Sequence, residues 1–299
     1  MSDFRSGFAC FVGRPNVGKS TLMNALVGQK VAIMSSRPQT TRRAIRGIVH
    51  RDDAQLVIVD TPGLHRPRTL LGERLNDLVR ETFAEVDVIG FCLPANEKIG
   101  PGDKWIAREL SQARAPVVAV VTKTDTVSRD RVAQHLMDVM ALGEWADVVP
   151  VSSVKDVQID VLTDVLVQHM PKGPALYPDG AVTDEPEDVM IAELIREAAL
   201  EGVRDELPHS IAVVIEEMVE PGTEESSREV LEIRAQLYVE RDSQKGIIIG
   251  KGGERLREVG ATARQGIERL LGRRVHLDLH IKVAKEWQRD PKQLGRLGF

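Results

Sequence analysis

Glycine, lysine and serine stand at fixed spacing near the start of the chain, where they could bind a polyphosphate. The segment GRPNVGKST, residues 13–21, fits the pattern G-x-x-x-x-G-K-[ST]. In that pattern successive backbone N–H groups surround the phosphates at a helix N-terminus, whose dipole adds partial positive charge. Gly13 and Gly18 let the backbone approach the phosphates closely. Lys19 would neutralise the outer phosphates, and Ser20 would offer its hydroxyl to Mg²⁺; an ordinary glycine-rich turn is the weaker alternative.

A second phosphate-facing segment is DTPG, residues 60–63, which follows the apolar run QLVIVD. Parallel strands end at the same sheet edge, so Asp60 can reach the Mg²⁺ shell while the Gly63 N–H meets the terminal phosphate. By itself DTPG is also a common turn. Between the first helix and this strand lies the polar segment SSRPQTTRRAI, residues 35–45. A threonine there could complete the Mg²⁺ coordination when the terminal phosphate is present. Thr41 is favoured and Thr40 is the alternative, and a solvated loop without a role is the third possibility.

Two later segments predict which base is bound. TKTD, residues 122–125, follows the run PVVAVV, and the Asp125 carboxylate there could accept hydrogen bonds from both N1–H and the exocyclic amine of guanine. Adenine lacks that pair of donors, so GTP is favoured over ATP and a kinase built on the same phosphate loop is disfavoured. The stem of Lys123 would lie over the base. VSSVK, residues 151–155, could supply backbone contacts to the guanine O6, although a helix cap is the alternative for this segment alone.

The candidate residues follow from these four segments. Lys19, Thr41 and Gly63 are the candidate catalytic residues, and Ser20, Thr41 and Asp60 are the candidate Mg²⁺ ligands. The candidate GTP-binding residues are Gly13, Arg14, Pro15, Asn16, Val17, Gly18, Lys19, Ser20, Thr21, Asp60, Thr61, Pro62, Gly63, Leu64, Thr122, Lys123, Thr124, Asp125, Ser152, Ser153 and Val154.

A different glycine-rich loop stands in the last third of the chain, within KGIIIGKGGERLREVG, residues 245–260. A G-x-x-G loop before a long helix is the device with which K-homology domains clamp the backbone of single-stranded nucleic acid. A glycine-rich helix start is the alternative. The candidate RNA-binding residues are Ile249, Gly250, Lys251, Gly252, Gly253, Arg255 and Arg257. The strand 275–283 and the helix 253–271 would form the sides of a groove for unpaired bases.

Charge supports this assignment, because it is distributed unevenly along the 299 residues. The whole chain carries a formal net charge of −5, but residues 1–172 carry +2, residues 173–233 carry −14 and residues 234–299 carry +7. Exposed charges act over only about 8–10 Å in cell-like salt, so the basic last third is a candidate phosphate-binding surface despite the acidic whole. Aromatic residues make up 4%, which argues against base stacking as the main means of gripping nucleic acid.

The elements that must position these residues fall into two groups. Up to about residue 170, short apolar runs alternate with amphipathic segments such as 103–114, 129–142 and 158–170, which predicts an α/β domain with a mostly parallel sheet covered by helices on both faces. The proline- and glycine-rich run 171–180 breaks both periods. A helix 185–201, strands 210–220 and 229–241, the helix 253–271 and the strand 275–283 then predict a smaller α+β domain. We expect domains at 1–172 and 183–299, joined by a linker at 173–182.

Composition narrows the cellular setting. Hydrophobic residues at 42% and charged residues at 28% indicate a globular protein. No apolar run approaches the 18 or so residues of a membrane span, and the first residues do not resemble a signal peptide. We therefore expect a cytosolic protein. Cys10 and Cys92 lie in apolar runs and are predicted to be small core residues rather than a disulfide or metal site.

The chain resembles the Era-like GTPases, within the translation-factor-related class. The resemblance is carried by GRPNVGKST, QTTR, DTPGLH, the G-x-x-G loop and the ending WQRDPKQLGRLGF. The resemblance covers essentially the whole chain. It implies a P-loop GTPase domain followed by a type II K-homology domain, with GTP and GDP, Mg²⁺ and small-subunit ribosomal RNA near its 3′ end as partners. It also implies peripheral contact with the inner face of the cell membrane, although no basic amphipathic helix or lipidation site in the sequence explains that contact. A monomer is expected.

Three positions qualify this resemblance. Leu64 stands where Ras-like enzymes have the glutamine that orients water, so slow intrinsic hydrolysis is expected. Asn16 corresponds to an asparagine that helps related GTPases bind a monovalent cation such as K⁺, with bracing of the phosphate loop as the alternative. Thr122 replaces the usual asparagine, which leaves one contact to the base or the phosphate loop in question and predicts somewhat weaker binding.

The leading expectation is a GTP-hydrolysing switch that binds small-subunit ribosomal RNA and assists subunit assembly and RNA processing. The alternative is an RNA-binding assembly factor in which nucleotide is a ligand and hydrolysis is incidental.

Overall fold

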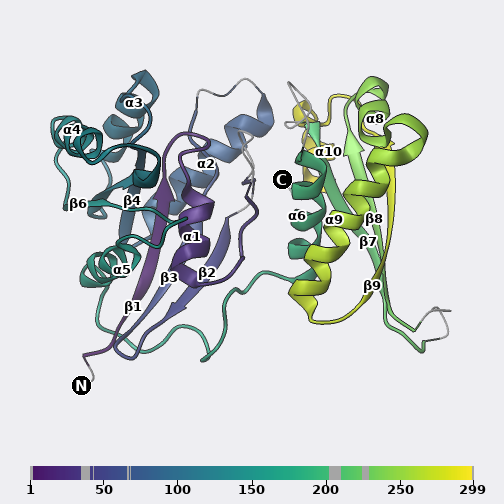
Figure 1. The fold of residues 1–299 in the computed structure, drawn as a ribbon, viewed down its shortest axis with the longest axis horizontal. Coiled ribbons are helices and arrows are strands. Elements are labelled where there is room, and N and C mark those ends of the chain that lie inside the picture. The colour runs from purple at the N-terminus through teal and green to yellow at the C-terminus, as the bar shows by residue number, and fades with distance from the viewer. Residues whose placement is uncertain are drawn as a thin grey trace. The chain divides into compact units, whose positions relative to one another are not determined.

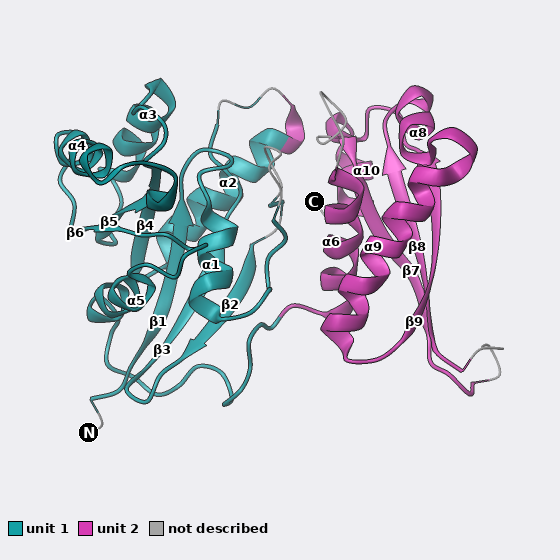
Figure 2. Ribbon diagram, in the orientation of Figure 1, with its two compact units in different colours: residues 1–68, 72–184 teal, residues 69–71, 185–299 magenta. Residues whose placement is uncertain are grey.

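A computed structural model divides the chain into two units. The structure describes residues 3–34, 41, 42, 44–65, 67, 69–201, 210–223 and 229–297. Residues 1–68 and 72–184 form the first unit, and residues 69–71 and 185–299 form the second (Figure 2). Residues 173–184, which include the predicted linker, therefore group with the first unit.

The first unit is an α/β domain with one six-stranded sheet (Figure 1). The strands stand in the order β2-β3-β1-β4-β5-β6, all parallel except β2, which pairs antiparallel with β3. This arrangement confirms the predicted mostly parallel sheet. The elements are β1 (Arg5–Val12), α1 (Lys19–Val27), β2 (Ile45–His50), β3 (Ala54–Asp60), α2 (Leu70–Glu85), β4 (Val88–Pro94), α3 (Pro101–Leu110), β5 (Val117–Thr122), α4 (Arg129–Met140), β6 (Asp147–Pro150) and α5 (Ile159–Gln168).

Helices cover both faces of this sheet, which is why strands near its centre are buried on both sides. β3 and β4 are buried at every residue. On one face of the sheet, α1 and α5 contact each other and the strands beneath them. On the other face, α2, α3 and α4 contribute Val79, Ile106 and Val139 to the core. Cys10 and Cys92 are both free and fully buried, as expected of core residues.

Strand β2 is an element that the sequence reading did not predict. Its sequence IRGIVH alternates only weakly and contains a glycine, so its strand signal is poor. It forms an edge of the sheet, and edge strands leave unpaired backbone groups. One of these groups is used, because the Ile48 N–H donates to the Val182 carbonyl at 2.9 Å.

Residues 173–184, called the strap below, are thus fastened to the first unit. The Gln55 side chain, only 1% exposed, makes three hydrogen bonds to the strap backbone. Its Oε1 accepts from the N–H groups of Leu176 (2.6 Å) and Tyr177 (2.8 Å), and its Nε2 donates to the Tyr177 carbonyl at 2.9 Å. A proline- and glycine-rich segment that reads as a free linker is therefore ordered by partners more than a hundred residues away in sequence.

The second unit is a three-stranded sheet with helices. Its elements are α6 (Glu187–Leu200), β7 (Ala212–Val219), β8 (Leu231–Val239), α8 (Asp242–Ile249), α9 (Glu254–Leu271), β9 (Val275–Val283) and α10 (Pro291–Arg296). β7 pairs antiparallel and β9 parallel with β8. The inward residues of these strands pack on α6 and α9, with Ile195, Leu237 and Ile267 fully buried. This confirms the predicted smaller α+β domain, to which the structure adds α8 and α10.

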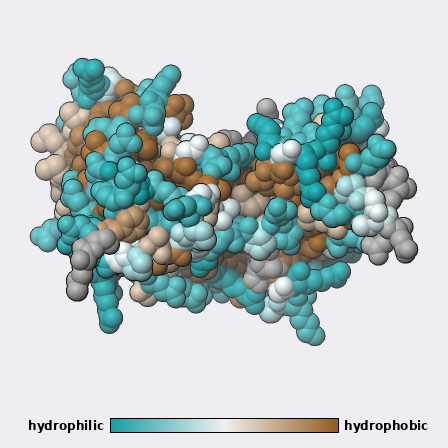
Figure 3. Space-filling view, turned by 90° about the horizontal axis from the view of Figure 1, so that it is seen from below, coloured by the Kyte–Doolittle hydropathy of each residue, from teal (hydrophilic) through white to brown (hydrophobic). Residues whose placement is uncertain are grey.

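The surface is mixed in character. On the face shown in Figure 3, hydrophilic side chains form most of the projecting surface and apolar side chains lie mainly between them. Among the described residues, none of the helices combines the length and apolar character that crossing a membrane requires.

Candidate functional site

The phosphate loop occupies the turn between β1 and α1, with Gly18 as the residue that leads into the helix. Gly18 has φ +101°, in the left-handed region that favours glycine, and a Cβ at Gly13 would lie 2.7 Å from the Cys92 carbonyl oxygen. The Lys19 Nζ donates to the carbonyls of Gly13 at 3.3 Å and Arg14 at 3.1 Å. The ammonium group is therefore held inside the loop, where a polyphosphate would lie.

Burial sets the electrostatics of this lysine. Lys19 is 6% exposed, and burial lowers its pKa, while the nearby Asp60 carboxylate opposes that shift. Burial also raises the pKa of the Cys92 thiol to about 12, so this thiol is neutral beside the lysine. A buried ammonium next to a single carboxylate provides a strong local positive charge for a phosphate.

The three candidate Mg²⁺ ligands lie within hydrogen-bond distance of one another. The Ser20 Oγ donates to the Asp60 Oδ2 at 2.7 Å, the Thr41 Oγ1 donates to the same oxygen at 2.9 Å, and the two hydroxyls are 3.0 Å apart. They come from α1, from the segment before β2 and from the end of β3. An oxygen-only set with one carboxylate suits Mg²⁺, which also keeps ligands from water and nucleotide phosphates. The alternative ligand, Thr40, lies outside the described residues.

The DTPG segment lies directly against the phosphate loop. A Cβ on Gly63 would come within 2.7 Å of the Pro15 nitrogen, so only a glycine permits this approach. The Leu64 N–H donates to the Gly13 carbonyl at 3.2 Å, and the Thr61 hydroxyl donates to the Phe11 carbonyl at 2.7 Å. Pro62 is buried between these two anchored residues.

The Leu64 side chain is buried in the apolar core. It is 2% exposed and belongs to the core cluster that includes Val79 and Phe91. Leu64 contributes its backbone N–H to the contact with the phosphate loop, and its aliphatic side chain offers no hydrogen bond to water.

The base-recognition residues gather at the ends of β5 and β6. The Thr122 hydroxyl donates to the Val17 carbonyl of the phosphate loop at 2.6 Å. Threonine therefore keeps a direct tie between this strand and the phosphate loop, which answers one of the questions raised by the missing asparagine. The Lys123 Nζ donates to the Asn16 carbonyl at 2.6 Å, so its stem crosses the same loop.

The carboxylate predicted to select guanine is held by a buried serine. The Ser152 Oγ, on a fully buried residue, donates to the Asp125 Oδ1 at 2.6 Å and also accepts from the Lys155 N–H. The Thr124 hydroxyl donates to the Val151 carbonyl at 2.9 Å, which joins the two segments a second time. These bonds fix the orientation of the Asp125 carboxylate. Ser153 is half-buried, and Val154 is 73% exposed beside it.

One predicted nucleotide contact is directed elsewhere. The Arg14 guanidinium donates from Nε to the Asp103 Oδ1 at 2.7 Å and from Nη2 to the Glu97 Oε2 at 2.8 Å. Gly102 makes room for this side chain, because a Cβ there would lie 2.8 Å from the Arg14 Cδ. Only the Arg14 backbone belongs to the phosphate loop, and the side chain ties that loop to the N-terminus of α3. The sequence reading missed Asp103 and Glu97.

The second candidate site is the loop between α8 and α9, KGG at residues 251–253 after Gly250. Gly252 and Gly253 have φ +61° and +78°, and Gly250 has φ +72° with ψ −179°. That last combination is essentially confined to glycine. Lys251 is exposed, Ile249 is half-buried against the core, and the Arg257 Nη2 donates to the Gly252 carbonyl at 2.9 Å.

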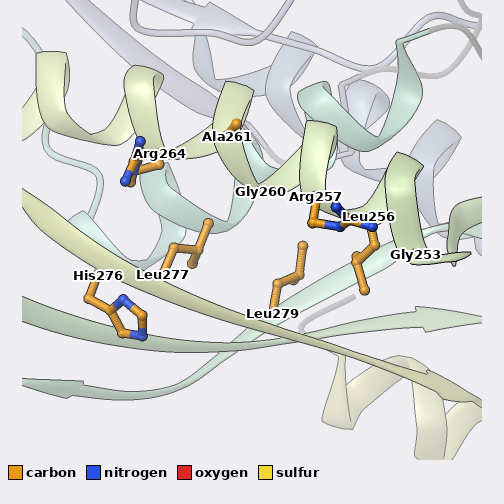
Figure 4. Close-up of a pocket in the computed structure, with 9 residues that line it drawn as sticks. All are labelled: Gly253, Leu256, Arg257, Gly260, Ala261, Arg264, His276, Leu277 and Leu279. Atoms are coloured by element: carbon orange, nitrogen blue, oxygen red, sulfur yellow. The ribbon is translucent and has the colours of Figure 1, made fainter.

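A pocket of about 440 Å³ opens between α9 and β9 beside this loop (Figure 4). Gly253, Leu256 and Arg257 stand at one end of it, and Arg264 and His276 at the other (Figure 4). Gly260, Ala261, Leu277 and Leu279 complete its lining. Its sides are the predicted groove walls. Arg264 was not predicted, although it lies seven residues after Arg257 and hence on the same helix face.

The fold and these two sites define a class of protein: a P-loop GTPase domain joined to a K-homology domain. A family model described as "50S ribosome-binding GTPase" matches residues 8–123, and a "KH domain" model matches residues 206–288. The chain is 65% identical over 302 residues to "GTPase Era" of Mycolicibacterium smegmatis, a match that covers all of both chains. It is 66% identical to "GTPase Era" of Streptomyces coelicolor over 99% of this chain and 95% of the relative. The chain belongs to the GTPase Era family and is a GTPase.

Solved structures agree with this assignment. Era in complex with MgGDPNP and nucleotides 1506–1542 of 16S ribosomal RNA has a TM-score of 0.93, 36% identity and 99% coverage of both chains. A single-residue variant of Aquifex aeolicus Era bound to GDP·AlF4⁻ matches equally well, with the same TM-score, identity and coverage.

Proposed function

We propose that this protein is a GTP-hydrolysing switch that binds small-subunit ribosomal RNA near its 3′ end and assists small-subunit assembly and RNA processing. One observation carries the proposal: the candidate phosphate, metal and base residues lie together in the first unit, and the second unit has a G-x-x-G loop with a groove beside it. Each site is formed by residues of one unit, so the presence of one site does not follow from the presence of the other.

The first unit supports the nucleotide half of the proposal. Ser20, Thr41 and Asp60 would hold Mg²⁺, which would supply charge neutralisation at the outer phosphates. Lys19 and the Gly63 N–H would bind the terminal phosphate, and Asp125 would select guanine. The Era structure that holds MgGDPNP has the same fold at a TM-score of 0.93.

The second unit supports the RNA half. The same Era structure contains nucleotides 1506–1542 of 16S ribosomal RNA. In this protein the groove beside the loop is lined by glycine and alanine on the helix side, which permits close approach of bases, and by Arg257 and Arg264 at its two ends. Such a groove suits an unpaired RNA segment whose phosphates pass the loop.

Slow intrinsic hydrolysis is part of the proposal, because the buried Leu64 side chain cannot orient water. A monovalent cation beside Asn16 would add positive charge where the leaving oxygen becomes negative. GTPase rates measured in K⁺ and in Na⁺ at equal ionic strength test the cation, and we expect faster turnover in K⁺. Equal rates would remove the cation and leave Asn16 as a brace of the loop.

A second candidate function is favoured by the same leucine. Because the Leu64 side chain cannot orient water, the alternative is an RNA-binding assembly factor in which nucleotide is a ligand and hydrolysis is incidental. Multiple-turnover phosphate release with and without small ribosomal subunits separates the two. A switch requires release that ribosomal RNA or subunits stimulate, whereas an unstimulated trace rate supports the ligand role.

The same proposal places the protein in the cytoplasm as a monomer, with a share at the inner face of the cell membrane. Cell fractionation with and without high salt tests the membrane share. Sedimentation of the purified chain tests the monomer.

A further inference from the structure

Two arginines in the first turns of α9 have different surroundings. Arg255 lies at the C-terminal end of α6, where its Nη2 donates to the Glu201 carbonyl at 2.6 Å and lies 3.5 Å from the Ala199 carbonyl. α6 ends at Leu200, so these oxygens belong to the negative end of the helix dipole. Arginine is a suitable partner for such carbonyls, because its planar group donates several hydrogen bonds at once.

The loop rests on the backbone of this same residue. A Cβ on Gly250 would lie 2.7 Å from the Arg255 Cβ and 3.1 Å from its nitrogen. The first glycine of the loop is thus packed against the first turn of α9, in a conformation that other residues do not adopt. Any movement of Arg255 away from α6 would move the surface on which Gly250 is seated.

Arg257 has different surroundings from Arg255. It is exposed, its Nη2 donates to the Gly252 carbonyl at 2.9 Å, and it lines the groove next to Gly253 and Leu256 (Figure 4). The Arg257 guanidinium is thus bonded to the loop itself and lines the groove, where a phosphate at the loop would pass, whereas the Arg255 guanidinium is bonded to carbonyl oxygens at the end of α6.

We propose that Arg255 is a positioning residue for RNA binding, which ties the loop at residues 250–253 to the C-terminal end of α6 and does not contact the RNA phosphates. This departs from the sequence expectation, which placed Arg255 beside Arg257 as a phosphate contact. The inference rests on the proposed RNA binding of the second unit.

The two roles differ in a measurable way. A side chain that neutralises a phosphate of single-stranded nucleic acid makes the plot of log affinity against log salt concentration steeper by about 0.7. Removing a side chain that only holds the loop lowers the fraction of molecules that are competent to bind. Affinity then falls by the same factor at every salt concentration.

The experiment compares two matched variants of the full chain, Arg255→Met and Arg257→Met. Methionine keeps an apolar stem in each case and removes the charge. Affinity for an RNA covering nucleotides 1506–1542 of 16S ribosomal RNA is measured over a series of salt concentrations. We expect R257M to reduce the salt slope by about 0.7. We expect R255M to weaken binding by about tenfold with the slope of the wild type.

Amide hydrogen exchange without RNA provides the second readout. R255M should exchange faster than wild type at residues 250–253 and at the end of α6, and R257M should leave the end of α6 unchanged. A reduced salt slope in R255M with normal exchange would overturn the proposal and make Arg255 a phosphate contact. Wild-type affinity and exchange in R255M would overturn it as well.

If R255M does not fold, Arg255→Lys replaces it. Lysine keeps the charge but not the planar group, so a phosphate contact would retain wild-type affinity and exchange. A positioning role predicts weaker binding with an unchanged slope and faster loop exchange. Absence of RNA binding by the wild type would refute the proposed function instead, and the exchange comparison would still decide whether Arg255 holds the loop.

Discussion

At the scale of single residues, hydroxyl and carboxylate groups of the candidate nucleotide site are hydrogen-bonded to one another. Ser20 and Thr41 both donate to one Asp60 oxygen, and Ser152 fixes one Asp125 oxygen. Such contacts hold the groups in place, so that a metal or base meets a preformed arrangement rather than mobile side chains.

Thr122 offers a direct test of this preorganisation. Replacing it with valine keeps the shape but leaves the Val17 carbonyl without its 2.6 Å donor. We expect GTP affinity to fall by about tenfold, because a buried acceptor that loses its partner costs about 1–3 kcal/mol. Thr122→Asn, which restores the family's usual residue and a donor, should bind GTP at least as tightly as wild type. Equal affinities for the valine variant and wild type, measured by fluorescent-nucleotide titration, would contradict the role of the hydroxyl.

His135 supplies a prediction about pH. It is 1% exposed on α4, and neither ring nitrogen has a hydrogen-bond partner among the described residues. Burial lowers its pKa from 6.5, and Arg131 lowers it further, while Asp138 and Asp103 oppose the shift. The folded state therefore favours the neutral ring more than the unfolded state does. The stabilisation is complete above about pH 6.5 and is lost as the pH falls from there toward the lowered folded pKa.

The matching variant is His135→Leu. Its free energy of unfolding, measured by denaturant titration, should depend less on pH than that of wild type between about pH 7 and 5. The two pH slopes should differ by at most about 1.4 kcal/mol per pH unit, the value for one proton. Parallel pH profiles for the two proteins would show that another group is responsible.

At the scale of elements, the strap at residues 173–184 changes how the connection between the two units is understood. It follows α5, and its residues bond to β2 and to the Gln55 side chain. The Arg46 guanidinium on β2 also pairs with Asp184 at 2.9 Å. β2 in turn follows the segment that carries Thr41. The strap is therefore attached to the strand that follows the candidate Mg²⁺ ligand Thr41 in the chain.

Gln55→Leu tests the attachment. It removes three hydrogen bonds to the strap, and we expect the first unit to lose about 1–3 kcal/mol of unfolding free energy. Proteases should also cleave within residues 173–184 more readily and release the two units. Lys172→Ala, which removes only the exposed pair with Asp3, is the control and should change stability by less than about 0.5 kcal/mol. Unchanged stability and cleavage in Q55L would show that the strap does not depend on this side chain.

At the scale of the whole molecule, the net charge is negative, yet both proposed partners, nucleotide and RNA, carry phosphate groups. Both sites are suited to phosphate, one through a lysine and a helix N-terminus and the other through a glycine loop with basic neighbours. Each unit has its own core, so each site can form without the other. What makes the chain a switch is the proposed dependence of one site on the occupancy of the other.

That dependence can be measured directly. RNA affinity of the full chain should differ by about fivefold or more between the empty protein, the GDP complex and the complex with a non-hydrolysable GTP analogue, since allosteric coupling usually amounts to about 1–3 kcal/mol. Linkage then requires RNA to change nucleotide affinity by the same factor. Identical RNA affinities in all three states would remove the coupling while leaving both binding sites intact.

Local chemistry explains what could be read from the sequence. The phosphate loop, DTPG, TKTD and the G-x-x-G loop each consist of neighbouring residues whose backbone and side chains act together, so their types and spacing indicate their role. The alternation of apolar runs and amphipathic segments determined the sheet-and-helix class for the same reason.

Tertiary structure decided where the longer side chains and the connecting segment go. Arg14 and Arg255 stand within binding motifs, yet their guanidinium groups meet Asp103 and the end of α6, partners far away in sequence. Thr122 keeps its tie to the phosphate loop because the fold places the Val17 carbonyl beside it, and the strap is ordered because Gln55 is buried beneath it. A long flexible side chain or a proline-rich segment can take many conformations, and the fold determines which partner it meets. Because these partners are distant in sequence, motif spacing does not indicate them.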